Sequence, residues 1–367
     1  MAMQSPLPVR DGVNATRLRI PREGPWASVM DYMLERFGHV DPGGIIRRFH
    51  DGEVVGLGAE PLTPTTPLGV HDFLWYYRNL PDEPHLPVTE TILFQDEDLL
   101  VVDKPHFLPT TPGGRFVQES ALVRLRNRLG LPDLIPMHRL DRATAGVILF
   151  STNPATRGAY QTLFEHRRIE KEYRCVSALP TGWGETVPGS RQDGSGHDGR
   201  GHDDDAPAAG APPAASGPGR HGQDVRQFGG EHRATAADFP LEYRNRMTKE
   251  KGYLLALTQP GEPNAETRID LLGTGVSTGI HAGTAVGLFR LRPHSGKTHQ
   301  LRVHMAALGL GIVNDPFYPV LLDKAPDDFT RPLQLLAHSI SFTDPLSGVP
   351  VTFTSQRTLD EFPGPVR

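Results

Sequence analysis

The sequence predicts an α+β fold, with a mainly antiparallel mixed sheet in a large domain that follows a small α/β module. Two observations lead to this prediction. Apolar runs of strand length and amphipathic stretches of helix length are mixed without the strand–helix–strand order of a parallel sheet. The composition also changes along the chain, because a Gly- and Pro-rich segment interrupts its second half. With 367 residues, the chain is long enough for two or three domains.

The small module extends over residues 16–88, after a flexible N-terminus of residues 1–15. Its predicted elements are two helices followed by two strands, at Trp26–Phe37, Ile45–His50, Val54–Val55 and Phe73–Tyr77. This order resembles the RNA-binding module shared by a small-subunit ribosomal protein and several RNA-modifying enzymes. The resemblance implies that Arg47 and Arg48, on the second helix, contact RNA. An arginine pair on a solvated helix face is an equally good explanation, and the excess of acids leaves open a degenerate module.

The large domain covers residues 89–180 and 239–358 and is followed by a tail of residues 359–367. Its predicted strands are Ile92–Phe94, Leu99–Val102, Gly146–Phe150, Lys171–Ala178, Gly252–Leu257, Val286–Leu291, Ser339–Phe342 and Val349–Phe353. Its predicted helices are Gln118–Leu129, Ala155–His166 and Thr298–Leu308. A polar turn at residues 95–98 indicates that the first two strands form a hairpin.

Residues 181–238 are predicted to be a disordered insertion. They contain 13 Gly and 5 Pro, but no Leu, Ile or Met. Such a composition buries too little apolar surface to offset the entropy of ordering. Four histidines lie among its aspartates, and we interpret them as part of a solvated tether rather than as metal ligands. No metal site is therefore predicted.

The overall composition excludes several classes of protein. A single cysteine rules out a disulfide framework and a cysteine-rich zinc site, and no apolar run is long enough to span a membrane. Because the first 13 residues lack an apolar signal core, a cytoplasmic location is expected. The formal net charge of −5 comes from 38 basic and 43 acidic residues, and the insertion alone holds nine acids against five arginines. An acidic total therefore does not exclude nucleic acid as a partner.

Polar residues interrupt core-like patterns in three segments of the large domain. These are "MHRLDRATAGVILF" (Met137–Phe150), "KEYRCVSAL" (Lys171–Leu179) and "LRPHSGKTHQLRVHMAALGL" (Leu291–Leu310). Loops at the ends of the strands of a sheet commonly carry catalytic groups. The candidate residues are His138, Arg139, Asp141, Arg142, Thr144, Tyr173, Lys297, His299, Gln300 and Arg302. From its surroundings alone, Asp141 is equally well explained as the cap of a turn or as the partner of Arg142.

Taken in order, the segments resemble the RluA-type RNA pseudouridine synthase family. "HRLDRATAGVILF" matches the family's Asp-bearing motif, with Ala145 where serine is commoner. "ILFQDEDLLVVDKP" matches its opening strand motif, and "SGKTHQLRVHMAALG" matches its third motif, with Lys297 where arginine is commoner. Because three motifs in order are more specific than one, the resemblance favours a catalytic role for Asp141.

The resemblance implies isomerisation of uridine to pseudouridine in a structured RNA, without a cofactor. It implies that Asp141 is the nucleophile or charge-stabilising carboxylate, that Lys297 lowers the pKa of Asp141, and that Tyr173 stacks on the base. Arg139 is expected to fill the space left by a flipped uridine, and His138 to orient or pack. The remaining implied RNA contacts are Arg142, Thr144, His299, Gln300 and Arg302.

The expected substrate is ribosomal RNA, favoured by the N-terminal module, or transfer RNA. We expect a monomer with no membrane association and no obligate protein partner. An alternative function is an RNA-binding or RNA-folding factor that has lost catalysis, motivated by Ala145, Lys297 and the acidic N-terminal block. A DNA-binding regulator is disfavoured, because no recognition-helix motif occurs and a base-flipping pocket suits looped RNA.

Overall fold

The computed structural model describes residues 5–80, 82–183, 234–323 and 326–364. The chain divides into two compact units. The first comprises Met1–Cys175, Pro326–Leu359 and Pro365–Arg367, and the second comprises Val176–Ala325 and Asp360–Gly364. Strand β7 (Glu170–Ala178) begins in the first unit and ends in the second.

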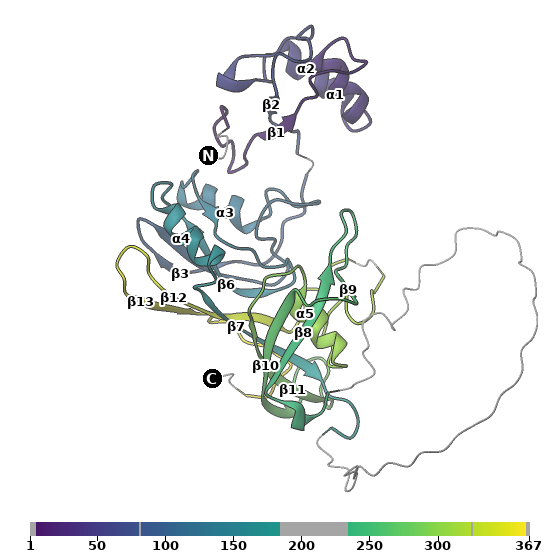
Figure 1. Ribbon diagram of the computed structural model, residues 1–367, viewed down its shortest axis with the longest axis vertical. Coiled ribbons are helices and arrows are strands. Elements are labelled where there is room, and N and C mark those ends of the chain that lie inside the picture. Colours follow the sequence, from purple (N-terminus) through teal and green to yellow (C-terminus); the bar gives the residue numbers. More distant parts are fainter. Residues whose placement is uncertain (1–4, 81, 184–233, 324–325, 365–367) are drawn as a thin grey trace, which may run out of the picture. The chain divides into compact units, whose positions relative to one another are not determined.

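The N-terminal part of the first unit pairs two short strands with two helices (Figure 1). Its elements are β1 (Thr16–Arg19), α1 (Val29–Phe37), α2 (Pro42–His50), the 3-10 helix η1 (Leu57–Ala59) and β2 (Phe73–Tyr76). The Ser28 side chain caps α1 by accepting the backbone N–H of Asp31, and the Asp41 side chain caps α2 by accepting that of Gly44. The predicted helices and the second strand are therefore confirmed. The predicted strand at Val54–Val55 is wrong, because Val55 forms only isolated bridges.

The rest of the first unit is built on a mostly antiparallel sheet. Its strands are β3 (Thr91–Gln95), β4 (Leu99–Lys104), β5 (Ile135–Pro136), β6 (Ala145–Ser151), β12 (Leu335–Thr343) and β13 (Pro350–Thr354), together with the first part of β7. The order is β3-β4-β6-β12-β7, with β5 on β6 and β13 on β12. Only the short β6–β12 pairing is parallel among the described strand pairs of this unit. The predicted α+β class is confirmed.

Helices α3 (Ala121–Leu129) and α4 (Arg157–Glu165) cover opposite faces of this sheet. Side chains alternate between the two faces of a strand, so every second residue of β4 and β6 meets the same helix. Ile148 and Phe150 belong to the apolar cluster that includes α3, whereas Val147 and Leu149 belong to the cluster that includes α4. As a result, all seven residues of β6 are buried. The turn that precedes β6 is therefore attached to a well-packed strand.

The second unit contains the remaining strands and one buried helix. Its elements are η3 (Ala236–Asp238), β8 (Leu241–Thr248), β9 (Leu257–Gln259), β10 (Ala265–Val276), β11 (Ala285–Pro293) and α5 (Gln300–Ala307). The strand order is β11-β10-β8-β9, and all eight residues of α5 are buried. The predicted strand at Gly252–Leu257 is wrong, because β9 begins only at Leu257. Among the described residues, no helix combines the length and apolar character that crossing a bilayer requires.

The predicted insertion at 181–238 is ordered at both of its ends. The Trp183 ring lies 6.3 Å from Phe239 and 6.4 Å from Phe289. On the other side, Ala234 donates its N–H to the carbonyl of Leu308, and η3 follows. The prediction of disorder therefore does not hold for these two ends of the segment. Its remainder, residues 184–233, lies outside the described residues.

His304, in α5, makes the stability of the second unit dependent on pH. Its side chain is fully buried, with Nδ1 2.9 Å from Thr267 Oγ1 and Nε2 2.9 Å from Asn245 Oδ1. Burial lowers its pKa to about 3, against 6.5 for the free side chain. The folded state therefore excludes a proton that the unfolded state takes up below pH 6.5.

We expect the free energy of unfolding to fall as pH decreases from 6.5 towards 3, by up to about 1.4 kcal/mol per pH unit from His304. Urea titrations at pH 7, 6 and 5 measure this slope. His304→Gln should have lower stability at pH 7 but a shallower slope, because glutamine does not titrate. Equal slopes for the two proteins would contradict the prediction.

Candidate active site

Asp141 lies in a turn between β5 and β6. The backbone N–H of Thr144 donates to the carbonyl of Asp141 at 3.1 Å, which closes the turn one residue before β6 begins. Asp141 is half-buried, Arg139 is exposed and Thr144 is buried. The turn therefore holds one carboxylate at the end of a fully buried strand while leaving it partly accessible.

The loop after β4 holds both sides of this turn. The Thr110 hydroxyl donates to the carbonyl of Leu140 at 2.9 Å and accepts the N–H of Leu140 at 3.1 Å. His106 Nδ1 lies 2.7 Å from the carbonyl of Ala143. Burial lowers the pKa of His106 to about 4, so its ring is neutral at pH 7 and donates this hydrogen bond. Residues before and after Asp141 are thus tied to one neighbouring loop.

Lys104 lies behind the turn as a fully buried amine. Its Nζ donates to the carbonyls of Pro105 at 2.9 Å, Leu108 at 2.8 Å and Arg142 at 3.4 Å. Burial lowers the pKa of Lys104 to about 7, and the negative charge of Asp141 opposes this shift. Lys104 was not among the residues predicted from the sequence, although a lysine at the end of a buried strand was a signal for it.

Removing the Thr110 hydroxyl tests whether this loop holds the turn. Thr110→Val keeps the shape of the side chain but leaves the buried N–H and carbonyl of Leu140 without their partner. We expect the free energy of unfolding to fall by about 1–3 kcal/mol, and any activity that depends on Asp141 to fall by about tenfold because Asp141 is less well placed. Thr110→Ser keeps the hydroxyl and should preserve both. A fully active Thr110→Val protein would contradict the positioning role.

Tyr173 reaches the same region through the register of the sheet. Lys104 pairs with Gly146, Gly146 pairs with Ala337, and Ala337 pairs with Tyr173. One row across four strands therefore joins the end of β4 to β7. Burial, and after it the carboxylate of Asp141, raises the pKa of Tyr173 well above its usual range. The phenol of Tyr173 therefore stays protonated at neutral pH.

His138 is a packing residue in this structure. Its ring stacks on Phe164, with centroids 5.1 Å apart and planes 27° from parallel. Its Nε2 accepts the N–H of Leu149 at 3.1 Å, and burial lowers its pKa to about 3. The ring is therefore neutral, which agrees with the orienting or packing role considered for it and does not favour RNA contact.

The third sequence segment lies in the second unit. Arg302 is buried and binds Asp315 through a bidentate ion pair, at 2.8 and 2.5 Å. Gln300 is also buried and accepts hydrogen bonds from Ser295 and from the backbone of Lys297. Burial thus gives Arg302 and Gln300 structural roles, and it does not favour their predicted RNA contacts.

Two other residues of that segment are more accessible. Lys297 is exposed, and His299 is half-buried with Nδ1 2.9 Å from the hydroxyl of Tyr318. His299 has a φ of 57°, in the left-handed region, at the start of α5. The predicted effect of Lys297 on Asp141 and the predicted RNA contact of His299 stay predictions.

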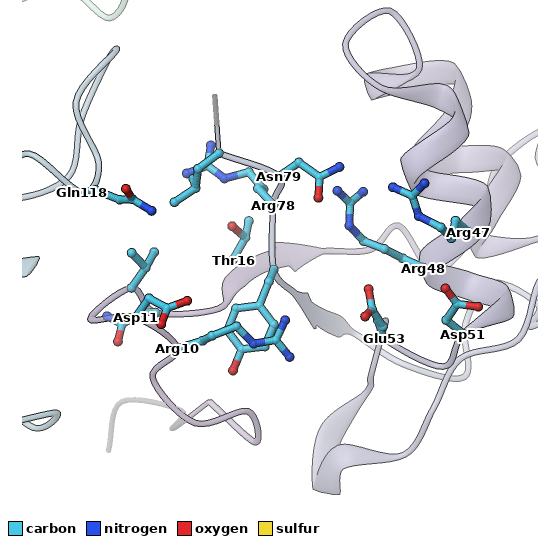
Figure 2. A pocket seen from close by; sticks show the side chains of 14 residues that line it. Arg10, Asp11, Thr16, Arg47, Arg48, Asp51, Glu53, Arg78, Asn79 and Gln118 are labelled. Atoms are coloured by element: carbon cyan, nitrogen blue, oxygen red, sulfur yellow. The ribbon is translucent and has the colours of Figure 1, made fainter. Parts of the chain in front are cut away.

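A polar cavity of about 440 Å³ lies in the first unit, lined by Gln118 and otherwise by residues of its N-terminal part (Figure 2). Arg10, Arg47, Arg48 and Arg78 line it, together with three acidic residues. The two predicted RNA contacts in α2 differ in environment. Arg47 is exposed, whereas Arg48 is buried, with Nη2 3.3 Å from Asp41 Oδ2. Arg47 is therefore the more accessible cation of the pair, and RNA contact by both stays a prediction.

A family model described as RNA pseudouridylate synthase matches residues 98–307, which is more than half of the chain. The chain belongs to the RNA pseudouridylate synthase family. The match includes Asp141, Tyr173 and Lys297, so it confirms the resemblance seen in the three motifs. The description of this family is that of an RNA pseudouridine synthase, an isomerase.

Individual relatives agree with this family. The dual-specificity RNA pseudouridine synthase RluA of Salmonella typhi is 29% identical over 279 residues, 75% of this chain and 94% of that protein. An uncharacterized RNA pseudouridine synthase of Synechocystis is 31% identical over 148 residues, 40% of this chain and 50% of that protein. Human pseudouridylate synthase RPUSD2 is 28% identical over 254 residues, 68% of this chain. This chain therefore spans only about a third of the length of RPUSD2 (34%) and half of the length of the Synechocystis relative.

A solved structure, human RNA Pseudouridylate Synthase Domain Containing 1, aligns with 75% of this chain and 86% of its own chain. The aligned sequences are 20% identical, and the TM-score is 0.44.

Proposed function

We propose that this chain converts uridine to pseudouridine in a structured RNA, with Asp141 as the catalytic carboxylate. One observation carries the proposal: the partly accessible Asp141 is held by a buried framework in the matched region of an RNA pseudouridylate synthase. The hydrogen bonds of Thr110, His106 and Lys104 fix the turn on both sides of it. Such preorganisation lets a side chain act without reorganising during the reaction.

The isomerisation breaks the bond between N1 of uracil and C1′ of ribose and forms a bond between C5 and C1′. The proton on C5 is lost and N1 gains one, so no group enters or leaves overall. Asp141 acts as the ionised nucleophile or as the charge that stabilises the separated sugar or base. Tyr173 stacks on the base, and its raised pKa suits a phenol that donates a hydrogen bond rather than one that removes a proton.

A uridine stacked in a helix or folded loop cannot reach Asp141 unless it leaves the stack. Flipping it out costs a few kcal/mol of lost stacking and pairing. Arg139 is exposed two residues before Asp141, and its planar guanidinium suits the space that the base vacates. We assign Arg139 this role.

The substrate proposed first is ribosomal RNA, with transfer RNA second, in a cytoplasmic and monomeric protein. The arginines around the cavity of the N-terminal module support RNA binding there, chiefly through the exposed Arg47. The aligned RluA relative is named dual-specificity, which supports testing more than one RNA.

The function is tested with total cellular RNA from a strain that lacks the gene. The purified protein is incubated with this RNA, and pseudouridine is mapped at nucleotide resolution by carbodiimide adduct stops. New sites that depend on Asp141 are the expected result, and their positions identify the substrate. Protein that binds this RNA but creates no site would instead support the non-catalytic RNA-binding factor.

A further inference from the structure

Asp327 joins two arginines that are distant from it in the sequence. Its carboxylate accepts hydrogen bonds from both terminal nitrogens of Arg142, at 2.9 and 2.5 Å, and from Arg115 at 2.9 Å. The side chains of Arg142 and Asp327 are 31% and 19% exposed, so solvent screens this pair less than a surface pair. Hydrogen bonding by Arg142 is the main cause that holds the pKa of Asp327 below its usual range. Asp327 is therefore ionised at neutral pH.

Aromatic contacts surround this ion pair. The guanidinium of Arg142 lies 4.7 Å from the centre of the Phe116 ring and 5.9 Å from that of Phe107. Phe329, two residues after Asp327, meets Phe107 edge-on at 5.0 Å between ring centroids. The segment at 327–329 is thus attached to the same loops both by charge and by aromatic packing.

The main chain of Arg142 belongs to the turn that Asp141 begins. Its carbonyl accepts the hydrogen bond from Lys104, and its side chain is held by Asp327. Both terminal nitrogens point to that carboxylate, and Nε is buried without a hydrogen-bond partner in the described part of the chain. This geometry fits an anchor better than a guanidinium presented to RNA.

We propose that Asp327 is a positioning residue, which holds the turn of Asp141 in its reactive geometry through Arg142. The inference rests on the proposed catalytic function of Asp141. It assigns Arg142 to the support of that carboxylate, in place of the predicted RNA contact. A displacement of a catalytic group by about 1 Å can lower the reaction rate about a hundredfold. We therefore expect loss of this ion pair to lower turnover and to leave RNA binding nearly unchanged.

Asp327→Asn removes the charge and keeps the shape. Asp72→Asn is the matched control, because Asp72 also binds one arginine, Arg22, in bidentate fashion at 2.8 and 3.0 Å but is exposed in the N-terminal part. Turnover is followed as tritium released from total RNA labelled at C5 of uracil, since this position loses its hydrogen. The half-saturating RNA concentration and the melting temperature are measured on the same proteins.

We expect Asp327→Asn to lower turnover by about 10- to 100-fold with a half-saturating RNA concentration changed less than about threefold. Asp327→Glu should recover part of the rate, and Asp72→Asn should match the wild type. Arg142→Lys should lower the rate similarly, and the double variant should be no slower than either single one. A change confined to the half-saturating concentration, or unchanged turnover, would overturn the inference.

Amide hydrogen exchange separates this inference from the proposed function. We expect Asp327→Asn to speed exchange in the peptide that contains residues 138–146, while Asp72→Asn leaves it unchanged. Unchanged exchange in Asp327→Asn overturns the anchor even when the chemistry cannot be followed. A wild-type protein that releases no tritium contradicts the proposed function instead.

Discussion

Asp141→Asn is expected to lower the rate of pseudouridine formation by at least about 10³-fold, while RNA affinity changes by less than about threefold. Asparagine has nearly the same shape as aspartate, so the turn and its hydrogen bonds to Thr110 and Lys104 remain. The amide carries no charge and is a poor nucleophile, so it can neither attack nor stabilise a separated sugar or base. Loss of function without loss of binding is the signature of a group that acts in the transition state.

The measurement combines tritium release from C5 with filter binding of the same RNA. Asp141→Ala should be equally inactive, since it also lacks the carboxylate. Asp133→Asn is the matched control, because Asp133 is exposed in the loop before β5. It should keep nearly full activity. If Asp141→Asn retains substantial activity, Asp141 is not the catalytic carboxylate.

Gly146→Ala is expected to lower the free energy of unfolding by at least about 3 kcal/mol, or to prevent folding. Gly146 has a φ of 116°, which side chains rarely adopt. A Cβ at this position would lie 2.2 Å from the carbonyl oxygen of Ala337 and 2.7 Å from two other backbone atoms of that residue. Because Gly146 is paired on both sides, with β4 and with β12, the backbone cannot move away without breaking the sheet.

Gly158→Ala is the control, and we expect it to raise the free energy of unfolding. Gly158 lies in α4, is exposed, and a Cβ there would meet nothing within 4 Å. Alanine in a helix is favoured over glycine by about 0.8–1 kcal/mol, so this protein should be more stable. Chemical denaturation of both variants gives the comparison. A Gly146→Ala protein within 1 kcal/mol of the wild type would show that the row from Lys104 to Tyr173 tolerates a larger residue.

Elements with strong periodicity were predicted well from the sequence. The helix ending at Phe37, the hairpin of β3 and β4, and the strands β6 and β7 all match their predictions within a few residues. Strands β1, β8 and β10 were missed. Exposed and half-buried residues alternate over most of β8, and its exposed positions carry charged side chains. Glycines interrupt β10, so neither strand reads as a continuous apolar run.

The sequence by itself was enough to predict the family and to single out Asp141. Three motifs in order, and the apolar residues around them, are local properties of the chain. Only the tertiary structure decided which side chains support Asp141 and which polar residues are buried. Lys104 and Asp327 meet the turn of Asp141 from 37 residues before it and 186 residues after it. Arg302 looked like an RNA contact in sequence, yet it is buried against Asp315. Local periodicity does not encode such partners, because strand pairing and loop packing bring them together only in the folded chain.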